Sequence, residues 1–396
     1  MNKRFLILAV LLISVLIMIS GCGNSKKMDE DGDDDLVSNS VNCISLGTSV
    51  EGADDSQSYW NIFNNNFARG ENGYYYLDSE SNHIMYFDAK TQKSKLLCNK
   101  EGCNHDTSSC DSYIGICQES SIWYYKGYLY ILKYTETNLM LERVNTDGSV
   151  KEDLFEVGGA YDKKHIYNLV FNDDCVYIYD RFGDYMTATE ASIRKRSLDG
   201  KQDEIIFSQT GKNIMVEAAK SYGDKLFFIV ENVPNEDKQS VAQSLGLYEY
   251  DYNTKQVKNI LDKNICDYTI DVEDELIYYY VMDDGLYEWD IASDKTTKIY
   301  DGAGNTSCKV SNDGNYLYMN FVQDKMTYML VMNLEGQQLN KIETGTANTN
   351  SYTNNNTFFG DEQYMFFSSG VGAKTQFKYI EKTDGATETK LMPLGN

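Results

Sequence analysis

A short segment with the sequence "LCNKEGCNHDTSSC" contains Cys98, Cys103, His105 and Cys110. Thiolate sulfur and imidazole nitrogen are ligands that zinc accepts, and three cysteines with one histidine make a complete tetrahedral set. The spacing matches no standard zinc finger, although the closeness of Cys103 and His105 is workable. A zinc site is therefore one interpretation of this segment.

Disulfides are a second interpretation, because Cys117 follows nearby. Pairs such as Cys98 with Cys110 and Cys103 with Cys117 would each contribute roughly 2 to 4 kcal/mol by restricting the unfolded chain. His105 would then have no role. A loop of free thiols is a third interpretation, and such a loop is reactive only where the pKa of a thiol is lowered. The sequence leaves these alternatives open.

The first residues indicate where the chain is located. The segment "MNKRFLILAVLLISVLIMISGCGNS" has a basic start, a long apolar run and small residues just before Cys22. This order is typical of a secretory signal, and it resembles the signal of bacterial lipoproteins. The resemblance implies cleavage after residue 21 and acyl chains such as palmitate on Cys22, which would hold the protein on the outer face of the cell membrane. An uncleaved membrane helix is the alternative.

Residues 22–58 are rich in carboxylates and poor in apolar side chains, so we expect a disordered, lipid-anchored linker. The folded domain is expected over residues 59–396. The whole chain has a formal net charge of −24, which repels phosphate backbones and argues against nucleic-acid binding. It also disfavours anionic lipid, so membrane attachment would depend on the acyl anchor.

The composition predicts strands, because the chain has 32 tyrosines and only 2 prolines. A turn followed by an aromatic strand recurs seven times, with the second turn residue at Gly73, Gly127, Asp174, Asp224, Asp274, Gly314 and Glu362. Successive turns lie between 40 residues (Asp274 to Gly314) and 54 residues (Gly73 to Gly127) apart. A period near fifty is typical of a four-stranded propeller blade.

A second phrase recurs later in most units, as in "HIMYFDAKTQKSKLL" and "GLYEYDYNTKQVKNIL". Each is an alternating strand, a polar turn and an outer strand of mixed polarity, which brings each unit to four strands. We therefore predict an all-β fold, a seven-bladed β-propeller of four-stranded antiparallel blades. Six or eight blades, or an array of two-sheet sandwiches, are the alternatives. The segment 98–117 lies in the longest interval and is predicted to be an insertion between two blades.

Two of the repeated segments resemble known propellers. The segment "GLYEWDIASDKTTKIYDG" is similar to the tyrosine-tryptophan-threonine-aspartate repeat, with Trp289 and Asp290 at the family's last aromatic and acidic positions, and "VSNDGNYLYMNF" resembles the TolB-type hairpin. The complete four-letter signature is absent. The resemblance over roughly residues 60 to 393 is to uncharacterised propeller lipoproteins of Gram-positive bacteria, which often carry a short cysteine-histidine segment.

No catalytic residue stands out. The chain has three histidines, His83 and His165 are isolated, and no serine-hydrolase, zinc-protease or phosphate-loop motif is present. Trp60, Trp123 and Trp289 are candidates for stacking on sugars, although propeller cores take up most such residues. We therefore predict a monomeric, non-catalytic module that binds or scaffolds an extracellular protein, peptide or glycan. The alternative is a secreted carbohydrate-active enzyme that uses aspartate and glutamate in the propeller channel.

Overall fold

The computed structural model of the chain describes residues 66–106, 108–115, 120–135, 137–158, 166–180, 188–233, 242–302, 308–346, 358–369, 376–382 and 392–393. The predicted signal segment, the linker, Cys22, Trp60, Cys117 and His165 lie outside the described residues. The described residues form 28 strands and no helix. Accordingly, none of these segments has the helical length and hydropathy that crossing a bilayer requires.

The strands form seven four-stranded antiparallel sheets, which we call blades 1 to 7 in chain order. Blade 1 contains β1 (Phe67–Arg69), β2 (Gly73–Asp78), β3 (His83–Asp88) and β4 (Lys93–Leu96). Blade 2 contains β5 (Ser121–Tyr125), β6 (Tyr128–Tyr134), β7 (Leu139–Asn145) and β8 (Lys151–Gly158). Blade 3 contains β9 (Tyr167–Asn172), β10 (Cys175–Asp180), β11 (Glu190–Ser197) and β12 (Asp203–Thr210).

The remaining four blades have the same order. Blade 4 contains β13 (Ile214–Tyr222), β14 (Lys225–Asn232), β15 (Gln243–Asp251) and β16 (Val257–Leu261), and blade 5 contains β17 (Ile265–Asp271), β18 (Leu276–Val281), β19 (Gly285–Asp290) and β20 (Lys295–Asp301). Blade 6 contains β21 (Lys309–Asn312), β22 (Leu317–Gln323), β23 (Met326–Met332) and β24 (Gln338–Thr346). Blade 7 contains β25 (Phe358–Gly360), β26 (Tyr364–Ser369), β27 (Gln376–Glu381) and β28 (Met392–Pro393). The predicted seven-bladed propeller is confirmed.

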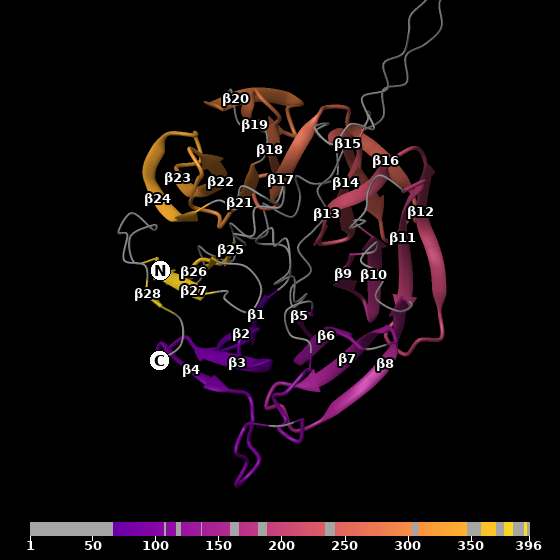
Figure 1. The fold of residues 1–396 in the computed structure, drawn as a ribbon. Coiled ribbons are helices and arrows are strands. Elements are labelled where there is room, and N and C mark those ends of the chain that lie inside the picture. Colours follow the sequence, from indigo (N-terminus) through magenta and orange to yellow (C-terminus); the bar gives the residue numbers. More distant parts are fainter. Residues whose placement is uncertain are drawn as a thin grey trace, which may run out of the picture. The chain divides into compact units, whose positions relative to one another are not determined.

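The blades surround a common centre, with the first strand of each blade innermost and the fourth outermost (Figure 1). The inner strands β13 and β17 are buried along their whole length, whereas the outer strand β20 is largely exposed. An inner strand is covered on both faces, so even its charged residues are buried, as where the Lys220 ammonium of β13 lies 3.3 Å from the Asp267 carboxylate of β17. An outer strand needs apolar residues only where it meets its own blade.

Aromatic and aliphatic side chains bury the faces between neighbouring blades. Each apolar cluster joins residues of at least two blades, as where Tyr75 and Ile84 of blade 1 pack with Ile122 and Tyr124 of blade 2. Such clusters exist for every pair of neighbouring blades around the ring. The high tyrosine content therefore supplies the packing between blades.

Side chains close the ring between blades 7 and 1, because each of these blades is built from four consecutive strands of its own. The Phe366 ring lies 5.1 Å from the ring of Phe67 and 4.6 Å from that of Tyr74, measured between centroids. The guanidinium of Arg69 donates two hydrogen bonds to Glu362, at 2.9 and 2.6 Å. Packing and this ion pair replace the strand exchange that would otherwise link the two ends.

The core also takes up residues that the sequence offered for other roles. Trp123 and Trp289 are buried, with 2% and 6% of their surfaces exposed, so neither presents a face to a sugar. The side chains of Cys175, Cys266 and Cys308 are buried and not joined in disulfides, as predicted for small apolar residues.

Candidate metal centre

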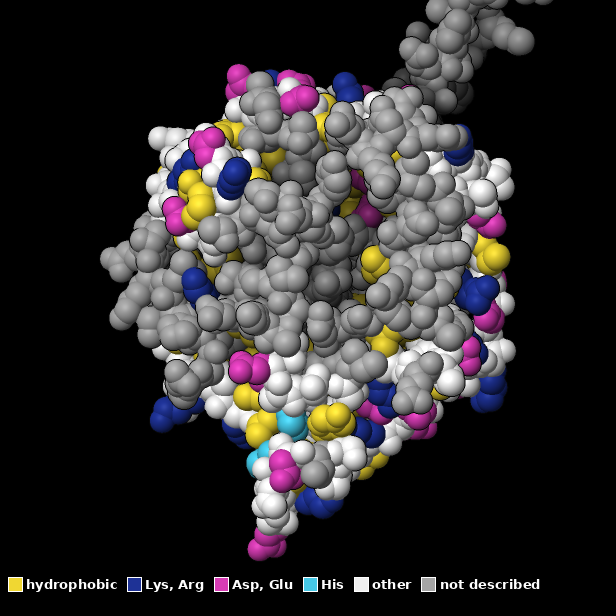
Figure 2. Space-filling model, viewed as in Figure 1, with side chains coloured by type: hydrophobic (Ala, Val, Ile, Leu, Met, Phe, Trp, Pro, Cys, Tyr) yellow, Lys and Arg dark blue, Asp and Glu magenta, His cyan; other side chains and the backbone are white. Residues whose placement is uncertain are grey.

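The cysteine-histidine segment connects blade 1 to blade 2. Cys98 follows the end of β4 by two residues, and the segment leads to β5. The connection projects from the edge of the ring (Figure 1). Figure 2 shows the same projection, with histidine side chains near its base. The described part of this segment, up to residue 115, lies between β4 and β5.

Backbone hydrogen bonds attach the end of this segment to blade 1. The amide of Ile84 donates to the carbonyl of Ser112 at 2.8 Å, and the amide of Ile114 donates to the carbonyl of Asn82 at 3.1 Å. His83 and Tyr113 form an isolated antiparallel bridge. Since the side chain of Ile114 is also part of the core between blades 1 and 2, residues 112–114 are fixed to the ring.

Blade 2 holds the segment from the other side. The Lys151 ammonium donates to the Tyr113 carbonyl at 2.7 Å, and the Asn99 side-chain amide donates to the Asp147 carbonyl at 3.3 Å. Gly148 has a positive φ of 79°, and a Cβ there would lie 2.4 Å from the carbonyl oxygen of Leu97. Only glycine fits this contact, which lets the turn after β7 close against the start of the segment.

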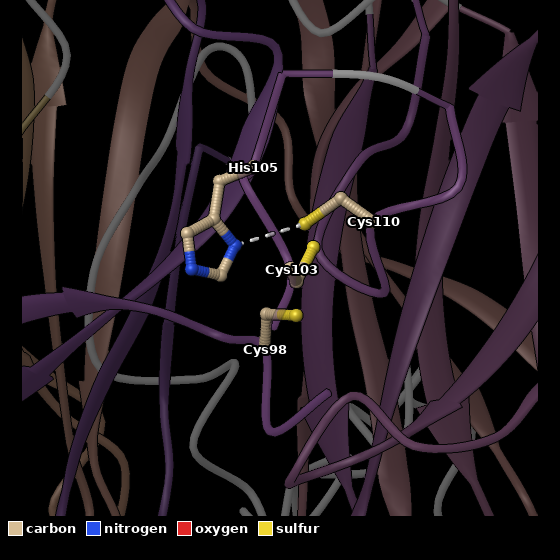
Figure 3. Close-up of side chains that lie close together, drawn as sticks. All are labelled: Cys98, Cys103, His105 and Cys110. Carbon is tan, nitrogen blue, oxygen red and sulfur yellow. Dashed lines mark hydrogen bonds between the residues drawn. The ribbon is translucent and has the colours of Figure 1, made fainter. Parts of the chain in front are cut away.

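Four ligand atoms converge inside the segment. The sulfurs of Cys98, Cys103 and Cys110 and a ring nitrogen of His105 all lie within 4.8 Å of one another. Nδ1 of His105 lies 3.3 Å from the sulfur of Cys110, and Figure 3 shows the four side chains pointing toward a common centre. His105 reaches this position with a positive φ of 58°, which few non-glycine residues adopt. This group can hold a metal ion.

The distances suit a tetrahedral ion. Zinc bound at about 2.3 Å to sulfur and about 2.0 Å to nitrogen separates two sulfurs by about 3.8 Å, and a sulfur from a nitrogen by about 3.6 Å. The observed 3.3 Å between His105 and Cys110 is close to the second value. With every ligand atom within 4.8 Å of the others, binding requires shifts of about 1 Å at most.

Backbone amides form hydrogen bonds with two of the three sulfurs, and the two thiols differ in the direction of their pKa. Burial raises the pKa of the Cys98 thiol, but the backbone amides of Lys100 and Asp111 and the neighbouring thiols outweigh it and leave the pKa below its usual value. The backbone amide of His105 lowers the pKa of the Cys103 thiol. Burial and the adjacent thiols raise that pKa by more, so the net pKa of Cys103 is higher than usual. Two of the three thiols thus receive an amide hydrogen, as metal-bound sulfurs commonly do.

The cluster contains no disulfide. Cys98, Cys103 and Cys110 are free thiols, and Cys117, which the sequence offered as a further partner, lies outside the described residues. Cys110 is 3% exposed, and its sulfur also contacts the hydroxyl of Ser112 at 3.1 Å. The other two thiols are half-buried.

Sequence reasoning missed the residues that support the cluster. His83 stands 22 positions before His105 in the sequence, yet its ring lies 5.6 Å from that of Tyr113. Burial lowers the pKa of His83, and a charge on His105 lowers it further. Lys151 is farther away in sequence, on blade 2. No local pattern connects these residues, because the ring packing brings them together.

No protein-family profile matches the chain, and no curated protein matches its sequence. Solved structures do match. A prolyl endopeptidase gives a TM-score of 0.52 at 12% identity, over 86% of this chain and 51% of its own, so the chain spans about half of that protein. An oligogalacturonate lyase from Vibrio parahaemolyticus gives 0.50 at 13% identity, over 83% and 92%. TolB from Acinetobacter baumannii gives 0.40 at 14% identity, over 81% and 76%.

At such identities the likeness concerns the fold alone. The chain is a β-propeller protein with seven four-stranded blades. The segment between its first two blades carries a group of three cysteines and one histidine, and this group can hold a metal ion.

Proposed function

We propose that this protein is a non-catalytic binding or scaffolding module in which a zinc ion fixes the loop between blades 1 and 2. The convergence of Cys98, Cys103, His105 and Cys110 within 4.8 Å carries the proposal. Three sulfurs and one nitrogen fill the tetrahedral shell of zinc and leave no open position for water, which is the arrangement of structural sites.

A disulfide explains less of this geometry. One disulfide would use two of the three thiols. It would not account for the position of the third thiol or of the His105 imidazole, which lie within 4.8 Å of the other ligand atoms. A metal ion uses all four side chains and also the amide hydrogens on the sulfurs. The segment has few apolar residues before Ile114, so a bound ion would supply the order that a core cannot.

The loop is the feature most suited to binding a partner. A propeller presents its loops on a rigid frame, and binding residues occur disproportionately on such loops. We propose that its partner is an extracellular protein, peptide or glycan, and that the protein acts as a monomer. In this proposal acyl chains on Cys22 hold it on the outer face of the membrane, and the supporting observation is the sequence "ISGC" after an apolar run.

Metal analysis tests the zinc site. We expect one zinc per chain, and thiols in the cluster that react with a thiol reagent only after chelation. Cys103→Ser should lose zinc, whereas Cys175→Ser should keep it, because Cys175 is a buried free thiol on β10 outside the cluster. A chain without metal, or one in which both variants behave alike, contradicts the proposal.

The anchor and the binding role need separate tests. Labelled palmitate should be incorporated by the native chain and not by Cys22→Ala. Binding to a glycan array or to cell-envelope fractions should fall when the cluster is emptied by chelation and return when zinc is restored. If the protein instead released sugar from a glycan, and replacing one aspartate or glutamate of the propeller channel abolished that release, the protein would be a carbohydrate-active enzyme.

A further inference from the structure

The two half-buried thiols of the cluster differ from the third in how firmly they are held. Cys110 is 3% exposed and lies next to Ser112, in the stretch bonded to β3. Cys98 and Cys103 are more exposed, so a small solute reaches them first. Reactivity at this cluster therefore begins at Cys98 or Cys103.

The turn between these two thiols contacts the rest of the chain through two exposed side chains: the Asn99 amide donates to the Asp147 carbonyl at 3.3 Å, and the Lys100 ammonium donates to the Ser109 carbonyl at 3.1 Å. Gly102 has a positive φ of 71°, and a Cβ placed on it would meet nothing within 4 Å. The amide of Cys103 donates to the carbonyl of Lys100 at 3.2 Å. Both groups belong to the turn, so this hydrogen bond is kept when the turn shifts as a unit. The sulfurs start within 4.8 Å, and a disulfide needs about 2.0 Å. Joining Cys98 to Cys103 therefore requires a movement of this short turn, which lies after the end of β4 at Leu96.

We propose that a peroxide-class oxidant joins Cys98 and Cys103 in a disulfide and thereby releases the bound metal. This regulation rests on the zinc site proposed above. Only His105 and Cys110 remain as ligands after the reaction, and two donors do not hold zinc against water. The loop tip is then released, while the stretch at Ser112 to Ile114 stays bonded to blade 1.

The reaction balances in two steps. One thiolate attacks a peroxide oxygen, the O–O bond breaks, and a sulfenic acid forms while hydroxide leaves and becomes water on taking a proton. The second thiolate attacks the sulfenic sulfur, the S–O bond breaks, and a second hydroxide leaves and is protonated. Two thiolates lose one electron pair to hydrogen peroxide, which becomes two waters. A thiol reductant reverses the reaction and restores the site.

Hydrogen peroxide added to the zinc-loaded full chain tests this inference, with released zinc followed by a coloured chelator. We expect about one zinc released per equivalent of peroxide. Trypsin cleaves after Lys100, so the expected disulfide joins two peptides that are otherwise separate, and fragmentation identifies which cysteine is bonded to Cys98. Buried Cys308 should stay reduced and serves as an internal control.

Cys103→His is the informative variant, because it keeps four metal donors and removes one half of the disulfide. We expect it to bind zinc and to release it at least about tenfold more slowly under the same peroxide. Zinc that stays bound in the native chain, or a disulfide from Cys98 to Cys110 instead, overturns the inference while the zinc site stands. A chain that never holds zinc overturns both proposals.

Discussion

Replacing Arg69 by methionine tests how the ring is closed. The Arg69 guanidinium of blade 1 forms two hydrogen bonds with Glu362 of blade 7 and lies 3.3 Å from the carboxylate of Asp361. The two acidic groups differ, because the Asp361 side chain is 1% exposed and that of Glu362 is 56% exposed. Methionine keeps the apolar stem and removes the charge, so the change isolates the ion pairs.

The expected loss of stability is about 2 kcal/mol. Breaking a fully buried pair costs about 3 to 5 kcal/mol, because a charge is left in the interior. Asp361 keeps hydrogen bonds from the Tyr74 hydroxyl and from the amides of Gln363 and Tyr364, and Arg69 is itself 31% exposed, so the cost is lower. The exposed contact with Glu362 adds less than about 1 kcal/mol.

Lys126→Met is the matched control. Lys126 bonds Asp174 at 2.9 Å between blades 2 and 3, but 46% and 75% of these side chains are exposed, so its loss should cost less than about 0.5 kcal/mol. Urea unfolding followed by fluorescence measures the stability of both variants.

The effect of Arg69→Met should also depend on pH. Burial raises the pKa of Glu362, but Arg69 and a backbone amide lower it by more, so the net pKa of Glu362 is lowered. The stabilisation that ionised Glu362 gains from Arg69 is present above the ordinary glutamate pKa and is lost as the pH falls through the lowered pKa. The loss of stability caused by Arg69→Met should therefore be smaller in acid. Equal effects of the two variants would refute this account of closure.

Three further predictions concern the core and the support of the cluster. Phe366→Ala should cost about 3 to 5 kcal/mol in urea unfolding, because the ring is fully buried between blades 7 and 1, and a loss below about 1 kcal/mol would contradict that packing. Burial raises the pKa of Tyr76 and of Tyr130 to about 12, so their contribution to stability should be complete below pH 10 and lost as pH rises toward 12. Phenolate absorbance should then appear together with unfolding, and gradual titration near pH 10 in the folded chain would oppose this. Lys151→Met should weaken zinc binding about tenfold in competition with a chelator and leave ring stability nearly unchanged, because Lys151 holds the Tyr113 carbonyl beside the cluster; unchanged affinity would argue against that support.

The repeated architecture was predictable because each blade carries its own local signals. The turns at Gly127, Asp174 and Gly314 lie between the first and second strands of their blades, as the repeated phrase indicated. Closure was not predictable in the same way. The contacts of Arg69 with Asp361 and Glu362 join residues about three hundred positions apart, and no periodic pattern identifies such a pair.

The candidate metal site also has a part that was predictable from the sequence and a part that was not. Residue type and closeness in sequence were enough to find Cys98, Cys103, His105 and Cys110, because a single loop supplies all four. Sequence could not choose between metal and disulfide, since that choice depends on whether the imidazole points toward the sulfurs. The supporting contact from Lys151 depends on packing between blades and carries no signal in the segment itself.

X-ray absorption at the zinc edge of the purified chain measures the metal centre most directly. The account predicts one zinc with three sulfurs at about 2.3 Å and one nitrogen at about 2.0 Å. A chain without zinc, or a zinc surrounded only by oxygen and nitrogen, would contradict it.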